Sequence, residues 1–305
     1  MTGQITATIE ARDLEAIDNI IYEPKTEELT ARSVFPQKYD VNEGAESYSY
    51  DVMTRSGAAK VIANGADDLP LVDVDMVRKS VPIYSIGVGL SYTVQDLRAA
   101  RMQGTTVDTA KAATVRRAIA EKENSIAFRG EKKHAIKGAF EATGIQVDTS
   151  PTTGEGGASS WAKKTAEQII DEIGEAHTKI TVLPGYGTAS LKLCLPPKQY
   201  ELINKKRYSN EDSRSVLKVL QDNAWFSAIV RVPDLVGIGT ADSDSFVVIH
   251  DSNETAELII PLDITRHPEE YAFPRTKVPF EERTAGVVVR FPAAIVRVDG
   301  IYIIN

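Results

Sequence analysis

Hydrophobic and polar residues alternate over three stretches in the first third of the chain, with the two-residue period of a strand that has one buried face. These stretches are residues 48–52, 72–76 and 84–92. The turn residues NGADDLP precede the second stretch, as expected where a chain reverses direction between two strands. The pattern predicts a long β-ribbon over residues 46–92. Other segments must support it, because an isolated two-stranded ribbon is only marginally stable in water.

Residues 107–130, VDTAKAATVRRAIAEKENSIAFRG, have the period of one long helix with a thin apolar stripe. Val115, Ile119 and Ile126 supply most of this stripe, and Lys122 is expected to lie within it. About 20 helical residues extend about 30 Å, which is the width of a domain. A helix of this composition can bury only one narrow face, so most of its surface is expected to remain polar.

The second half of the chain contains separate groups of helices and strands. A stronger stripe of alanine and isoleucine covers residues 161–180, a further helix is expected to begin near Pro197, and residues 213–223 predict one more short helix. From Ala228 onward the pattern is mostly that of strands. Residues 148–160, DTSPTTGEGGASS, indicate a loop and a domain boundary. Helices and strands grouped in this way predict an α+β fold.

The composition is that of a folded soluble protein, with 42% hydrophobic and 26% charged residues in a chain of 305. The net charge of −8 argues against a nucleic-acid-binding surface, which requires basic side chains to displace counterions. Cys194 is the single cysteine and lies in a strand-like run, so we expect a buried thiol in a reducing compartment. The N-terminal residues resemble no signal peptide, and no apolar run is long enough to span a bilayer, so a cytosolic product is expected.

Two glycine-rich stretches raise the question of a nucleotide site. Gly87 and Gly89 lie inside an alternating strand with no helix directly behind them, which favours a bulge or a close backbone approach over a dinucleotide-binding turn. Residues 154–157 precede a helix, whose N-terminus can bind anions, but they lack the Gly-Lys-Ser/Thr ending of a phosphate-binding loop. We interpret this stretch as a mobile connector, and a cytosolic α/β enzyme that binds a phosphate ligand remains the alternative from another class.

The sequence contains few other candidates for metal-binding or catalytic residues. Asp242, Asp244 and His250 are a conceivable ion site, but aspartates in a polar turn usually stabilise the turn itself. Cys194 has no histidine nearby in sequence, and the chain contains no Gly-x-Ser-x-Gly nucleophile motif. The acidic cluster at 171–175 is expected on the solvated face of its helix. We therefore expect no catalytic residue, no cofactor site and no metal site, which favours a structural protein over an enzyme.

Four short sequence motifs, and the order in which they occur, resemble those of a known protein family. They are ADDLP at 66–70, LRAARM at 97–102, AATVRRAIAEKENSIAFRG at 112–130 and RTAGVVVR at 283–290. With these motifs in this order, the chain resembles the major capsid protein of tailed bacteriophages, which has the Hong Kong 97-type fold. The resemblance covers most of the chain from about residue 45 and is least distinctive around residues 205–275.

The resemblance implies a division of the chain into parts with assigned roles. The implied parts are an N-terminal arm at 1–45, an extended β-ribbon loop at 46–92, a peripheral domain at 93–150 with a spine helix at 107–129, an axial domain at 151–262, and closing strands at 263–305. The ribbon would lie over a neighbouring subunit, which would explain how a marginal ribbon is stabilised. The thin stripe of the spine helix would be sufficient because assembly adds to the stability of the fold.

The resemblance also implies partners. Copies of the chain would form pentamers and hexamers in an icosahedral head that encloses double-stranded DNA without sequence-specific binding and without a membrane. A separate scaffolding protein, a portal and decoration proteins are further expected partners, and the shell would assemble in the cytoplasm of the bacterial host and become part of the virion. Candidate intersubunit contacts in the ribbon are Tyr50, Lys60, Asp67, Asp68 and Arg78.

The sequence leaves covalent crosslinking and the type of shell undecided. Some members of the family join subunits through lysine–asparagine isopeptide bonds, for which Lys60 is a candidate without an identified asparagine partner. The shell of an encapsulin nanocompartment, which has the same fold and encloses cargo enzymes, is an alternative to the phage head.

Overall fold

A computed structural model describes residues 28–56, 73–95, 98, 102, 107–209 and 213–302. The helices are α1 (Ala31–Val34), α3 (Val107–Arg129), α4 (Ala166–Thr181), α5 (Pro197–Lys205) and α6 (Val216–Asp222). The strands are β1 (Gln37–Lys38), β2 (Ser47–Ser56), β3 (Asp73–Pro82), β4 (Tyr84–Thr93), β5 (Gly130–Glu131), β6 (Ile136–Lys137), β7 (Gln146–Thr149), β8 (Leu191–Leu195), β9 (Ala228–Arg231), β10 (Asp244–His250), β11 (Ala256–Ile259), β12 (Leu262–Arg266), β13 (Glu270–Ala272), β14 (Arg275–Thr284), β15 (Gly286–Val289) and β16 (Ile295–Tyr302). The α+β prediction is confirmed.

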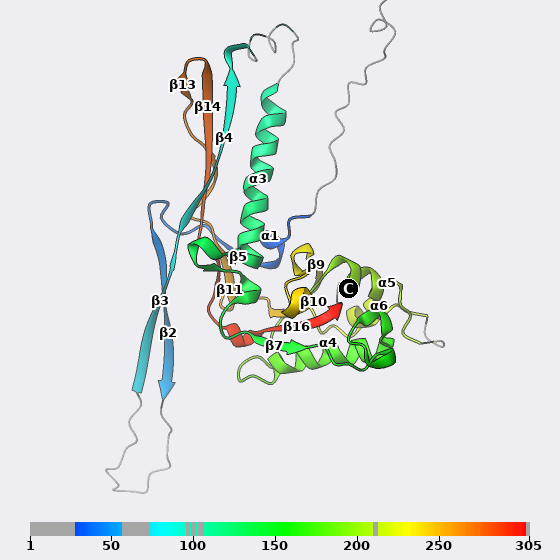
Figure 1. The fold of residues 1–305 in the computed structure, drawn as a ribbon. Coiled ribbons are helices and arrows are strands. Elements are labelled where there is room, and N and C mark those ends of the chain that lie inside the picture. Colours follow the sequence, from blue (N-terminus) through cyan, green and yellow to red (C-terminus); the bar gives the residue numbers. More distant parts are fainter. Residues whose placement is uncertain are drawn as a thin grey trace, which may run out of the picture.

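The elements form two arms that meet near α1, as Figure 1 shows. In one arm, α3 runs beside the long strands β4 and β14, with β13 at the outer end. The other arm contains the five-stranded sheet, in the order β7-β16-β10-β8-β9, together with α4, α5 and α6. The β2–β3 ribbon projects away from both.

The five-stranded sheet separates two hydrophobic clusters. Ile169 and Ile173 of α4 pack on one face of the sheet with Phe246 of β10. Cys194 of β8 and Val247 of β10 face the other cluster. Because β10 is covered on both faces, its central residues 246–249 are a continuous apolar run instead of an alternation. Complete burial raises the pKa of the Cys194 thiol to about 12, which makes it unreactive and confirms its expected structural role.

Helix α4 begins later than the predicted residue 161. Thr165 is its N-cap: the hydroxyl accepts a hydrogen bond from the backbone N–H of Gln168, and the Gln168 side chain accepts one from the N–H of Thr165. Residues 161–163 form a separate 3₁₀ turn. Apolar periodicity does not distinguish this turn from the helix, because the fully buried Trp161 of the turn packs in the same cluster as the α4 stripe.

The expected solvated position of the acidic cluster on α4 is wrong for Glu172. Its carboxylate is buried and accepts hydrogen bonds from Lys164 Nζ at 2.6 Å and from Trp161 Nε1 at 3.0 Å. Lys164 Nζ also donates to Ser150 Oγ at 2.8 Å. A pattern of apolar residues on one helix does not reveal such a pair, because the compensating lysine lies before the helix starts. Asp171 and Glu175 are exposed as expected.

The predicted ribbon is present as the antiparallel pair β2–β3, whose register runs from Ser47↔Pro82 to Ser56↔Asp73. The third alternating stretch, at 84–92, is also a strand, but it pairs with β14 over its full length and does not belong to the ribbon. The apolar residues of this strand face α3, so the helix buries them while β14 supplies the hydrogen-bonded neighbour. The part of the predicted 46–92 loop that forms the ribbon therefore ends near Pro82.

Gly87 and Gly89 lie in the regular β4–β14 ladder, and the register passes through both without a bulge. A Cβ at Gly87 would lie 3.7 Å from the Phe280 carbonyl oxygen, and one at Gly89 would lie 4.0 Å from that of Val278. Both are ordinary van der Waals distances, so the expected bulge or close approach is wrong.

The long helix over residues 107–129 is confirmed as α3, and its thin stripe packs along the β4–β14 pair. Val115 and Ile119 are buried against Tyr92, Val278 and Phe280. Lys122 does not lie within the stripe: it is exposed and forms an ion pair with Glu131. The buried polar residues of α3 are instead Glu123 and Asn124.

We predict that Glu172→Ala lowers the free energy of unfolding by about 3–5 kcal/mol, because it leaves the fully buried Lys164 ammonium without its partner. Glu175→Ala removes a carboxylate from the exposed face of the same helix and should change stability by less than about 0.5 kcal/mol. Urea denaturation of the two variants measures the difference. Equal effects would contradict the importance of the buried pair.

We predict that Ile119→Ala lowers the free energy of unfolding by about 2–5 kcal/mol, because a fully buried side chain is lost from a small cluster. Arg116→Ala, on the exposed side of α3, is the matched control and should change stability by less than about 0.5 kcal/mol. Thermal denaturation checks both. A tolerated Ile119→Ala would mean that α3 is held mainly by its polar contacts.

Candidate assembly surfaces

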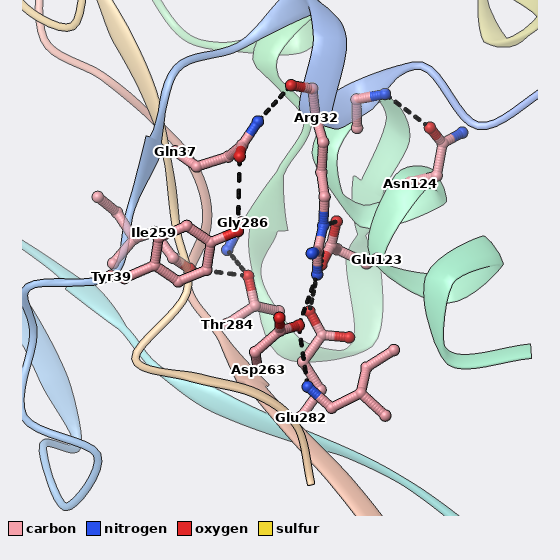
Figure 2. A network of polar contacts seen from close by, with 12 residues as sticks. Arg32, Gln37, Tyr39, Glu123, Asn124, Ile259, Asp263, Glu282, Thr284 and Gly286 are labelled. Atoms are coloured by element: carbon pink, nitrogen blue, oxygen red, sulfur yellow. Dashed lines mark hydrogen bonds and ion pairs between the residues drawn. The ribbon is translucent and has the colours of Figure 1, made fainter. Parts of the chain in front are cut away.

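The first candidate site is the junction where the N-terminal segment meets α3, shown in Figure 2. Asn124 Oδ1 accepts hydrogen bonds from the backbone N–H groups of Thr30 at 3.0 Å and Ala31 at 2.9 Å. These contacts supply partners for two of the amide groups at the start of α1, which a helix cannot satisfy internally. Helix α1 is thereby attached to a side chain of α3.

The Arg32 guanidinium lies at the centre of this junction and contacts three carboxylates. It donates to Glu123 from Nε at 2.9 Å and from Nη2 at 2.5 Å. Nη2 also donates to Asp263 Oδ1 at 3.0 Å and to Glu282 Oε1 at 3.3 Å. Glu123 is 3% exposed and Glu282 is 0% exposed, so one cation faces two buried acids and one partly exposed acid. We call Arg32, Glu123, Asp263 and Glu282 the arm junction.

The pKa values at the arm junction follow from burial and charge. Burial, together with the hydrogen bond and the charge of Glu123, raises the pKa of Glu282 to about 9, although the charge of Arg32 opposes this rise. The hydrogen bond to Glu123 raises the pKa of Arg32, so its positive charge is secure. Burial alone would raise the pKa of Asp263, but hydrogen bonds from Arg32 and from the N–H of Ile264 lower it overall.

The segment that follows α1 is joined to the body as a strand. The Gln37 side chain donates to the Arg32 carbonyl oxygen, and Tyr39 Oη donates to Gln37 Oε1 at 3.4 Å (Figure 2). Strand β1 pairs in parallel with β11, with Gln37 opposite Leu258. The N-terminal segment is therefore held by a strand pair as well as by side-chain contacts.

The second candidate site is the β2–β3 ribbon, which is anchored at its base. Tyr48 and Tyr50 stack at 6.4 Å between ring centroids, and the Arg290 guanidinium lies within 6 Å of both rings, at 5.9 and 5.8 Å. Tyr50 Oη donates to the Val289 carbonyl oxygen at 3.3 Å. The structure thus places the candidate Tyr50 in a contact with its own chain, and a contact with a neighbouring subunit stays a prediction.

The outer part of the described ribbon exposes apolar side chains. Met53 and Met76 lie opposite each other in the register, with 44% and 65% of their surface exposed, and Val74 on the same face is 46% exposed. Arg78 pairs with Asp51 on this face at 2.9 Å. We call Met53, Val74 and Met76 the methionine face. Exposed apolar groups of this kind mark surfaces that bind other proteins.

The other ribbon candidates, Lys60, Asp67 and Asp68, lie outside the described residues. Of the two described candidates, Arg78 has a side chain that is 73% exposed and forms an ion pair with Asp51. At the outer end of the arm that contains α3, the β13–β14 hairpin carries two exposed aromatic residues. Tyr271 is 66% exposed and Phe273 is 80% exposed. The described parts of both projections thus carry exposed apolar side chains.

The candidate ligand sites from the sequence have structural explanations. Asp244 is buried and accepts hydrogen bonds from Gln199 Nε2 at 2.8 Å and from the N–H of Gly237 at 3.1 Å. Across the part of the chain that the structure describes, no group of three potential metal ligands is found. The glycine-rich segment 154–157 forms a 3₁₀ turn over Glu155–Gly157 and does not open α4, which begins only at Ala166. A Cβ at Gly154 would lie 2.7 Å from the Ala158 carbonyl oxygen, so a glycine there permits a tight loop.

None of the helices among the described residues combines the length and the apolar character that a membrane span requires.

The arm junction was missed by sequence reasoning, because its residues come from four separate segments. One signal was present: Glu123 lies four residues after Ile119 and three before Ile126, on the buried stripe of α3. An acid at such a position requires a partner from elsewhere. The sequence does not say which of its many arginines and lysines provides it.

Comparison with known proteins adds to this picture. A family model described as major capsid protein matches residues 57–301. The capsid of the Myoviridae phage XM1 has a TM-score of 0.80 with 14% identity, covering 97% of this chain and 99% of that one. The capsid of an empty GTA particle has a TM-score of 0.66 with 12% identity, covering 98% and 100%.

A virus-like particle from Pyrococcus furiosus is also similar, with a TM-score of 0.61 and 15% identity over 88% of this chain and 91% of that one. No curated protein matches the sequence. At these identities the solved structures establish the fold, and the family model establishes the membership. The chain belongs to the major capsid protein family of tailed bacteriophages and has the Hong Kong 97-type fold, so it is a structural protein of a capsid shell.

Proposed function

We propose that this chain assembles as pentamers and hexamers into the icosahedral head of a tailed phage and encloses double-stranded DNA. The observation that carries the proposal is the shape of the subunit: the ribbon and the β13–β14 hairpin project from the body and expose Met53, Met76, Tyr271 and Phe273. A two-stranded ribbon without a core gains stability when a neighbour covers it. Because the chain belongs to the major capsid protein family, we infer that this neighbour is a second copy of the chain.

The proposal assigns roles to the parts of the chain. Residues 1–45 are the N-terminal arm, the β2–β3 ribbon with its connecting residues is the extended loop, and α3 is the spine helix of the peripheral domain at 93–150. The axial domain at 151–262 contains α4, α5, α6 and strands β8, β9 and β10 of the five-stranded sheet, which β7 and the closing strands at 263–305 complete. In support, β16 lies inside the five-stranded sheet while β14 lies beside α3, so the closing strands join the two arms.

The net charge of −8 is compatible with a DNA container, because a strongly basic lining would bind the packaged nucleic acid and hinder its movement. We further propose that the chain has no enzymatic role. A separate scaffolding protein, a portal and decoration proteins would complete the head in the host cytoplasm. Closed shells formed by the purified chain alone would contradict the need for a scaffold.

The similarity to the Pyrococcus furiosus virus-like particle supports a second candidate, a nanocompartment shell of the encapsulin type. The higher TM-score and the fuller coverage of the XM1 capsid favour the phage head. The contents of purified particles separate the two, since DNA indicates a head and a cargo protein indicates a nanocompartment.

The first experiment is a measurement of particle size by analytical ultracentrifugation, with electron microscopy of the fractions. Megadalton shells, or pentamers and hexamers that close at high concentration or with a scaffold, would support the proposal. A monomer or dimer that never assembles would contradict it and would favour the phosphate-binding enzyme, which predicts a rise in melting temperature with ligand.

We predict that the double variant Met53→Asp with Met76→Asp raises the concentration required for shell formation at least about tenfold, equivalent to about 1.4 kcal/mol per contact. The substitutions place charges where the methionine face would be buried. Ser80→Asp, on the same exposed face of the ribbon, is the control for added charge. Light scattering against concentration measures assembly, and unchanged melting of the subunit shows that the fold is retained. Normal assembly of the double variant would exclude the methionine face as a subunit contact.

A further inference from the structure

All three methionines in the described part of the chain are exposed to solvent. Met53, Met76 and Met102 have 44%, 65% and 90% of their surface exposed. Methionine usually fills gaps in a hydrophobic core, and a group of exposed methionines is typical of a surface that binds a partner. Met53 and Met76 lie opposite each other in the β2–β3 ribbon and form the methionine face with Val74. The subunit itself leaves this face largely uncovered.

The β13–β14 hairpin carries a second uncovered apolar group. Ala272 of β13 pairs with Arg275 of β14. Phe273 and Pro274 between them therefore form a two-residue turn at the tip of the hairpin. Such turns normally contain glycine, asparagine or aspartate, which accept the required backbone angles, so the turn itself does not call for a phenylalanine. Phe273 and the nearby Tyr271 are nevertheless both exposed, and we call these two residues the aromatic tip.

Charged residues of both signs surround each of these surfaces. Beside the methionine face, Arg78 pairs with Asp51 at 2.9 Å. Beside the aromatic tip, Glu270 lies opposite Lys277 in the register. An apolar centre with a polar rim is the usual composition of a surface that binds another protein. No block of like charge therefore opposes the approach of one surface to the other.

The two surfaces lie on opposite sides of the subunit. In Figure 1, the β2–β3 ribbon points away from the body in one direction, and the β13–β14 hairpin lies at the far end of the arm that contains α3. The ribbon of one chain therefore does not reach the hairpin of the same chain, whereas a neighbouring copy offers one. A contact between two different surfaces is head-to-tail, so every copy uses both of its surfaces, and such contacts can close into rings.

We propose that the methionine face of one copy packs against the aromatic tip of a neighbouring copy. Flexible methionine side chains adapt to a rigid ring, and contacts between their sulfur atoms and aromatic rings are favourable. This pairing covers the apolar groups of both projections at once. The inference rests on the proposed assembly into a shell, and it names the surface of the neighbour that receives the ribbon.

Crosslinking within assembled shells tests this contact. Cys194 is the single cysteine and is fully buried, so introduced thiols are the ones that react. The double variant Met76→Cys with Phe273→Cys is assembled, treated with a short bismaleimide and separated on a denaturing gel. Ser80→Cys with Phe273→Cys is the matched control, because Ser80 lies on the same face of the ribbon about 13 Å from position 76.

We expect at least about ten times more crosslinked chain in the Met76→Cys double variant than in the control, as a ladder of multimers that disappears when the subunits are dispersed before treatment. Shells without this ladder would overturn the proposal. Abundant dimers from either single variant, Met76→Cys or Phe273→Cys, would also overturn it, because that surface would then meet its own copy. A wild-type chain that forms no shells, even with a scaffold, would contradict the proposed function and this contact with it.

If the cysteine variants do not assemble, a pair of opposite charges replaces them. Met76→Lys and Phe273→Glu should each raise the concentration required for shell formation at least about tenfold, whereas the chain with both substitutions should assemble within about threefold of the wild-type concentration. The rescue is expected because the two new charges attract each other at the contact. Losses that add in the combined variant would overturn the pairing.

Discussion

The packing of α3 along the β4–β14 pair is the contact on which the architecture of this subunit depends. Val115 and Ile119 are the apolar contribution of the helix to that contact, and the strands provide Tyr92, Val278 and Phe280. The cluster is small, so each of its members has a large effect on stability. Further along the same helix, Glu123 and Asn124 fix the N-terminal segment to the body, and Ala127 and Phe128 pack in a second hydrophobic cluster.

Two of the buried ionic groups in the described part of the chain join segments that are separate in the fold. Lys164 and Glu172 connect the turn before α4 to the helix itself, and Arg32 connects α1 to α3, β12 and β14. Removing one partner of such a group leaves a buried charge, so the penalty for a wrong arrangement is severe. The second site differs from the first in that three carboxylates surround one cation.

The projecting parts of the subunit follow a different principle. The ribbon is anchored at its base by Tyr48, Tyr50 and Arg290, yet its outer face exposes Met53 and Met76. A chain that leaves such side chains uncovered gains stability by association with other copies, which agrees with membership of the capsid family.

The sequence by itself determined the strands at 48–52 and 84–92, the helix at 107–129 and the buried state of Cys194. In each of these, a local period or a single apolar environment decides the outcome. The short motifs of the sequence also indicated the family. Only the tertiary structure decided which strand pairs with β4, because an alternating pattern states which face is buried but not what covers it. The arm junction, likewise, was decided by the fold: Glu123 required a cation, and only folding brought Arg32, more than 90 residues away in the chain, to within hydrogen-bonding distance of it.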